Sequence, residues 1–116
     1  MVRTGDVAVR LTIHFDGAVL WHHRPAYAEL VHRAHREGLA GASVFHGFTG
    51  FGAQRVIHRE RPAHLAAKGP CAVVIVDEED RVRFFLLCVR DVLEHTEAVA
   101  VLDRVRIHHA GARAVR

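Results

Sequence analysis

The chain is poor in the residues that mark several common protein classes. Its two cysteines both lie inside apolar runs, which argues against a disulfide framework and predicts buried, reduced thiols. The longest apolar runs, 71–76 and 84–89, have six residues each, whereas a membrane-spanning helix needs about 20. The first residues also lack the apolar stretch of a signal peptide. These absences predict a cytoplasmic protein without direct membrane insertion.

Serine and lysine are almost absent as well. Ser43 is the only serine, and it lies in a predicted strand instead of the tight turn that exposes a catalytic serine. Lys68 is the only lysine among 16 basic residues, so arginine supplies nearly all of the positive charge. The formal net charge is +3, but no basic stripe is interleaved with aromatic residues. We therefore expect neither a nucleophilic enzyme nor a nucleic-acid partner.

The residues that are present predict one globular domain over 1–116, with its core at 7–107. Apolar and polar residues alternate over 7–15, which is typical of a strand with one buried face. The further predicted strands are 41–48, 71–76 and 97–107; one helix runs from Pro25 to Gly38, and another from the acidic residues 77–80 to Leu93. The order β-α-β-β-α-β is that of a ferredoxin-like α+β fold, an antiparallel four-stranded sheet with both helices on one face.

This fold leaves one sheet face without a partner. The strand 71–76 is apolar on both of its faces, and the last strand begins with apolar residues on both faces at 98–102. Helices on one side cover only half of these side chains. We therefore expect a second subunit to cover the rest, which makes the protein a homo-oligomer.

A glycine-rich stretch, Gly47-Phe48-Thr49-Gly50-Phe51-Gly52, follows the second predicted strand. Glycine lets backbone N–H groups approach an anion closely, as in phosphate-binding loops. The stretch has neither the lysine of a Walker loop nor the glycine spacing of a dinucleotide-binding turn. A turn with its two phenylalanines packed beneath it explains the same residues, so both interpretations stay open.

Arginines are the second candidate for binding an anion. The residues after the glycine-rich stretch form a basic loop, and arginine suits bidentate contacts to phosphate or carboxylate. A loop of more than about 12 to 15 residues in a small domain is usually functional or disordered. Arg104 and Arg106 share one face of the last strand, where they could also be plain surface residues. The basic residues of the loop are Arg55, Arg59, Arg61 and Lys68.

The 11 histidines invite a metal interpretation. None of them forms a cluster with the spacing of a zinc site, such as Cys-x-x-Cys or His-Glu-x-x-His. His32 and His35 lie on the wet side of the predicted helix, where exposed histidines are common. We therefore predict no metal ligands. Trp21, just before the helix, is either a ring-stacking residue or a hydrophobic staple over Tyr27.

Five short runs of the chain are shared with a known family. They are Leu11-Thr12-Ile13, Trp21-His22-x-x-Pro25-x-Tyr27, Gly38-Leu39-Ala40-Gly41-Ala42, Gly47-x-x-Gly50-Phe51-Gly52 and Val73-Val74-Ile75-Val76-Asp77. With them the chain resembles the PII-like "domain of unknown function 190" family, from about Val7 to Ile107. The resemblance implies a ferredoxin-like subunit of a PII-type homotrimer. It also implies that the segment 49–69 corresponds to the T-loop, the arm with which PII proteins contact a target.

PII proteins bind adenine nucleotides between subunits, near the base of the T-loop. By position, the resemblance assigns Gly47, Gly50, Phe51 and Gly52 to the base of the loop, and Arg104 and Arg106 to the nucleotide phosphates. Two departures stand out. The connection 95–97 is short and lacks the glycine-rich phosphate loop of PII proteins, and the long loop contains no tyrosine to modify.

The leading hypothesis is a trimeric PII-like regulatory protein, not an enzyme, that binds a small anionic ligand between subunits. An adenine nucleotide is the candidate ligand, and the partner is an unidentified protein, with a membrane transporter as one candidate. The predicted ligand-binding residues are Gly47, Gly50, Phe51, Gly52, Arg55, Arg59, Arg104 and Arg106, and the tail 108–116 is expected to be flexible. The alternatives are a CutA-like metal-binding or stress-related trimer and a slow phosphohydrolase.

Overall fold

The computed structural model describes residues 3–47 and 69–110. Four antiparallel strands form one sheet in the order β4-β5-β1-β6. A separate two-stranded hairpin of β2 (Leu20–Trp21) and β3 (Arg24–Pro25) precedes the first helix. The strands of the large sheet are β1 (Val7–Asp16), β4 (Ser43–His46), β5 (Pro70–Asp77) and β6 (Val99–Arg106).

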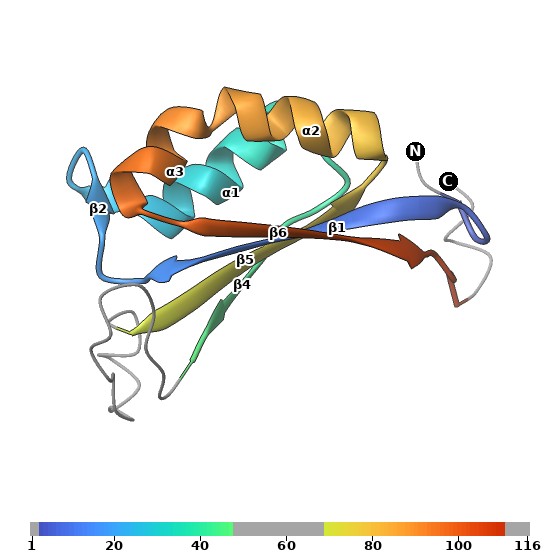
Figure 1. Cartoon of the computed structure of the whole chain (residues 1–116), viewed down its shortest axis with the longest axis horizontal. Helices are drawn as coiled ribbons and strands as arrows, with labels where there is room; N and C mark the ends of the chain where they lie inside the picture. Colours follow the sequence, from blue (N-terminus) through green and yellow to red (C-terminus); the bar gives the residue numbers. More distant parts are fainter. Residues whose placement is uncertain (1–2, 48–68, 111–116) are drawn as a thin grey trace.

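Three helices cover one face of this sheet, and no other described element covers the opposite face, as Figure 1 shows. They are α1 (Ala26–Arg36), α2 (Glu79–Cys88) and α3 (Arg90–Thr96). The arrangement confirms the predicted ferredoxin-like α+β fold. We call this opposite side the open face of the sheet. No helix in residues 3–47 and 69–110 is long and apolar enough to cross a membrane.

The core lies between the sheet and the helices, where the alternation in the sequence placed it. Leu11 and Ile13 of β1 are fully buried, while Arg10 and His14 on either side of this pair point to the open face. On β5, Val73 and Ile75 are buried in the same way. Full burial of such a side chain stabilises the fold by about 1.5–3 kcal/mol. The period of two in β1 therefore fixes which sheet face the helices cover.

The first helix ends as the sequence predicted. Gly38 adopts a left-handed conformation with φ +74°, which a residue without a side chain does at little cost. The amide of Leu39 then donates to the carbonyl of Ala34 at 3.1 Å. This is the hydrogen bond of a Schellman motif, which closes the helix and satisfies one of its last carbonyl groups.

The second predicted helix is in fact two. Val89, with φ −108° and ψ 12°, separates α2 from α3. The helical region also runs to Thr96, and β6 begins at Val99, so the predicted strand start at residue 97 was wrong. The Thr96 hydroxyl bonds back to the carbonyl of Val92 at 2.9 Å, and Glu97 adopts a left-handed conformation that ends α3. The side chain and the backbone thus both favour one more helical turn.

The hairpin β2-β3 was not predicted. Leu20–Trp21 pairs with Arg24–Pro25, and the two-residue turn between them is His22-His23. Both histidines have positive φ values, 47° and 71°, as a type I′ turn requires. Asparagine and glycine usually occupy such turns, so two histidines gave no turn signal. The Trp21 ring packs edge-on against His22 and His95, whereas the Tyr27 ring packs against His46.

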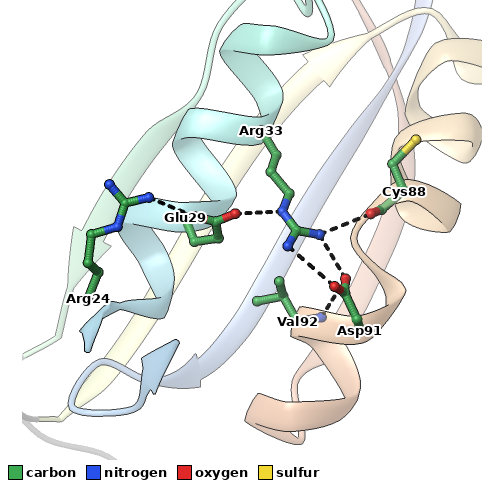
Figure 2. Close-up of polar contacts among 6 residues, drawn as sticks. All are labelled: Arg24, Glu29, Arg33, Cys88, Asp91 and Val92. Carbon is green, nitrogen blue, oxygen red and sulfur yellow. Dashed lines mark hydrogen bonds and ion pairs between the residues drawn. The ribbon is translucent and has the colours of Figure 1, made fainter. Parts of the chain in front are cut away.

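A charged network joins the helices at the break (Figure 2). The Arg33 guanidinium donates to Glu29 at 2.7 Å, to Asp91 at 2.7 Å and to the carbonyl of Cys88 at 3.1 Å. Arg24 also donates to Glu29, at 3.0 Å. The side chains of Glu29 and Arg33 are only 11% and 13% exposed. One arginine therefore links α1 to the end of α2 and to the start of α3.

Replacing Glu29 with alanine removes the buried half of this network. Hydrogen bonds from Arg33, more than those from Arg24, lower the pKa of Glu29 from its ordinary value of 4.5. The carboxylate therefore stabilises the fold fully above that value, and the contribution is lost as the pH falls through the lower, folded-state pKa. We expect E29A to lower the free energy of unfolding by about 2–4 kcal/mol at pH 7, and by less in acid.

Urea unfolding at several pH values measures this effect. The control is E94A, which removes an equally spaced but exposed pair, Arg90–Glu94, and should cost at most about 0.5 kcal/mol. Equal losses in E29A and E94A at pH 7 would contradict the assigned role of Glu29.

Candidate anion-binding site

Arg104 and Arg106 lie on the same face of β6, as the sequence predicted. The register places Arg104 beside Val9 and Arg106 beside Val7, on the side of the sheet that carries the helices. The Arg104 side chain is 75% exposed. Arg106 is exposed as well and donates to the carbonyl of Gly5 at 3.3 Å. Two guanidinium groups at one sheet edge are thus accessible to an anion.

Glu79 contacts Arg104 from the first turn of α2. Its Oε1 lies 3.5 Å from Nη2 of Arg104, and its Oε2 accepts a hydrogen bond from Nε of Arg83 at 2.8 Å. The bond from Arg83 and then the charge of Arg104 lower the pKa of Glu79. The sequence interpretation assigned the acidic residues 77–80 to the helix dipole and so missed this contact. Their closeness to β6 is a tertiary feature, which the local pattern does not contain.

Gly47 lies at the end of β4, next to the start of β5. Its amide donates to the carbonyl of Pro70 at 2.7 Å, and His46 pairs with Cys71 in the sheet. A Cβ added at Gly47 would come within 2.8 Å of Cγ of Pro70. Close packing against Pro70 therefore requires a glycine here, whatever the residue does for a ligand.

The sheet separates Gly47 from the arginines within one chain. Gly47 directly follows the last residue of β4, which pairs with β5 at the level of Phe15 in β1. Arg104 pairs with Val9, near the other end of β1. The six residue steps of extended strand from Val9 to Phe15 correspond to about 20 Å. Figure 1 shows the C-terminal ends of β4 and β6 at opposite ends of the sheet. One subunit alone does not bring the predicted site residues together.

The other predicted ligand-binding residues lie outside the described residues. They are Gly50, Phe51, Gly52, Arg55 and Arg59, and with them most of the segment 49–69. The predicted flexible tail is described only to residue 110, and there the amide of His109 donates to the Thr4 hydroxyl at 3.0 Å.

The described residues bear on two further chemistries, nucleophilic attack by a cysteine and the binding of a metal ion. Burial, and then the charge of Asp16, raises the pKa of Cys71 to about 11, so this thiol is protonated at neutral pH and is a poor nucleophile. Residues 3–47 and 69–110 contain no group of three or more His, Cys, Asp or Glu side chains that could hold a metal ion. A separate pocket of about 210 Å³ lies between Glu37, Leu39, Arg81 and Phe84, and it includes none of the predicted site residues.

Apolar side chains gather on the open face of the sheet. Phe45 of β4 is 59% exposed, and Val99 and Val101 of β6 are 56% and 45% exposed. The strand register places them on the same side as the half-buried Ala72 and Val74 of β5. The sequence predicted an uncovered apolar face, and these residues form it.

Comparison with known proteins places the chain in a family. The family DUF190, described as "Uncharacterized ACR, COG1993", matches residues 8–107. The chain belongs to the DUF190 family. A relative, a "UPF0166 protein" of Aquifex aeolicus (strain VF5), is 36% identical over 63 residues. That match covers 54% of this chain, and the chain spans only 60% of the length of the relative.

Solved structures show that this DUF190 chain has a PII-like fold. CPII of Thiomonas intermedia K12, a nitrogen regulatory PII-like protein bound to ADP, AMP and bicarbonate, is 16% identical and has a TM-score of 0.65. That comparison covers 88% of this chain and 89% of CPII. A candidate PII-like signalling protein of Thermus thermophilus is 14% identical with a TM-score of 0.64, over 90% and 92% of the two chains.

Substituting Gly47 with alanine tests the tight packing at the end of β4. Its Cβ would overlap the Pro70 ring, so we expect a loss of about 1–2 kcal/mol in the free energy of unfolding. The control is G41A, because a Cβ at Gly41 meets nothing within 4 Å. Denaturant unfolding of both variants measures the difference, and a G47A variant as stable as G41A would contradict this packing role.

Proposed function

We propose that this protein is a homotrimeric PII-like regulator that binds a small anionic ligand, such as an adenine nucleotide, between its subunits. Arg104 and Arg106 hold the phosphates, and residues around Gly47 of a neighbouring subunit complete the site. The segment 49–69 contacts a partner protein in response to the ligand. We also propose that the protein acts in the cytoplasm, and by binding, without catalysis.

The separation of the predicted site residues carries this proposal. Gly47 and Arg104 lie at opposite ends of one sheet, so a ligand of nucleotide size that touches both must lie at a boundary between two chains. Such a ligand needs residues from both ends of the sheet, and only the association of two chains brings these two ends together. This is the placement that the resemblance to PII proteins implies.

The open face supports the association itself. Exposed valines and a phenylalanine on one sheet face are costly in water, and burying them against another copy is favourable by about 25 cal/mol per Å². Arg10 and Asp103 form an ion pair at 2.6 Å on the same face, and the two side chains can stay paired with each other inside an interface. A ring of three copies would leave no such face uncovered.

The ligand class is supported by charge and by the neighbouring fold. Arginine offers a planar, bidentate fork that fits phosphate oxygens. CPII, which shares the fold, is bound to ADP and AMP. No group of side chains in residues 3–47 and 69–110 has the geometry that would favour the metal-binding alternative.

A charge on the open face should break the assembly. We expect the wild type to have three times the mass of the 13.0 kDa chain, and V101E to be smaller, because a buried, unpaired carboxylate is strongly unfavourable. Light scattering after size-exclusion chromatography measures this. The control is L87E, at an exposed apolar position on α2, which should keep the wild-type mass. A V101E trimer, or a monomeric wild type, would overturn the proposed assembly.

Ligand binding is tested by calorimetry with ATP, ADP, AMP and cyclic AMP. We expect at least one of them to bind the wild type, and R104Q to bind it about 10-fold or more weakly, because a charge-assisted contact to phosphate is lost. The control is R90Q, which removes an arginine of matching exposure, 76% against 75%, on α3. No binding of any nucleotide at millimolar concentration would overturn the nucleotide proposal. Phosphate release from bound ATP would contradict the absence of catalysis.

A further inference from the structure

The two oxygens of Glu79 have different partners. Oε2 accepts the hydrogen bond of Arg83 at 2.8 Å, four residues along the same helix, whereas Oε1 lies 3.5 Å from Arg104 on β6. The first contact is local and short, and the second is longer and joins two elements. The Glu79 side chain is 36% exposed, and both arginines are more exposed still. The carboxylate therefore occupies the side of Arg104 that faces α2.

We infer that Glu79 is a built-in competitor for the anion site: its carboxylate holds Arg104 until a ligand with several negative charges displaces it. The inference rests on the proposed function, since it names the residue that regulates the same site. A phosphate oxygen and the Glu79 carboxylate cannot both hold the same guanidinium N–H, and two like charges this close repel each other.

The exchange is feasible because each charge keeps a partner. An exposed ion pair contributes little to stability, so its contact with Arg104 is easily broken. When Glu79 leaves Arg104, its bond to Arg83 remains. Arg104 meanwhile gains the phosphate, and Arg106, on the same face of β6, is available to the same ligand. Displacement thus leaves no charge unpaired.

The same competition selects for ligand charge. A carboxylate tethered next to Arg104 acts at an effective concentration of about millimolar or more. A small monoanion carries one charge, as Glu79 does, so it gains nothing by replacing it. A nucleoside diphosphate or triphosphate has several charges and can contact both Arg104 and Arg106. We therefore expect the site to favour nucleotides with two or more phosphates.

Neutralising Glu79 tests the inference. In calorimetry with ADP, we expect E79Q to bind about threefold to tenfold more tightly than the wild type, since an exposed pair no longer has to be broken and a nearby like charge is gone. The matched control is E78Q, which removes the same charge from the residue one position earlier. It should change the ADP affinity by less than about twofold. Thermal unfolding of both variants shows whether the fold is kept.

The outcomes separate this inference from the proposed function. Tighter binding by E79Q alone supports the competitor role, which a merely structural Glu79 would not produce, because its loss would weaken the site. Equal ADP binding by wild type, E78Q and E79Q overturns the inference and leaves the proposed function standing. Tighter binding in both variants to the same extent also overturns the inference, because the loss of one negative charge near the site would then explain the effect. No ADP binding by either wild type or E79Q overturns the inference, and the nucleotide proposal falls with it when ATP, AMP and cyclic AMP also fail to bind.

Discussion

A single guanidinium group, that of Arg33, joins all three helices of the described residues at the break between α2 and α3. It holds Glu29 on its own helix, the carbonyl of Cys88 at the end of α2 and the carboxylate of Asp91 at the start of α3. Glu29 is only 11% exposed and lies close to the apolar core, where an unpaired polar group is costly. Arg33 therefore allows α2 and α3 to bend over the sheet as a pair. The alternation in β1 sets which face the helices cover, and Arg33 holds the helices together on that face.

Local patterns predicted the parts of the fold that depend on local physics. The alternation in β1 and the apolar run of β5 placed strands and core correctly, and Gly38 marked the end of α1, because each signal is contained in a few neighbouring residues. The break at Val89 was missed because the arginine that holds it, Arg33, is more than 50 residues away. The His22-His23 turn was missed because histidine is an unusual residue at positive φ.

At the candidate site, too, local features were predicted and contacts between distant residues were missed. The two arginines on β6 were found because side chains along a strand repeat every two residues. Their distance from Gly47 was not predicted, since it depends on the antiparallel pairing and register of the strands, which put the C-terminal ends of β4 and β6 at opposite ends of the sheet. Glu79 was counted as an N-terminal helix residue, and its contact with Arg104 arises only when α2 lies beside β6. The sequence therefore predicted candidate residues, whereas their positions relative to one another became known only from the fold.

The short connection between α3 and β6 limits which groups of the chain could bind a phosphate near the arginines. Only Glu97 and Ala98 separate the two elements, and Glu97 is used to end α3. Backbone amides of a glycine-rich loop, which could hold phosphates in a PII-type site, are therefore missing at this position. In the site that we propose, side chains supply the positive charge instead, and they are those of Arg104 and Arg106. A site built from flexible side chains is open to competition by a neighbouring carboxylate in a way that a rigid backbone cradle is not. The ion pair between Glu79 and Arg104 is the contact through which such competition would act in the proposed site.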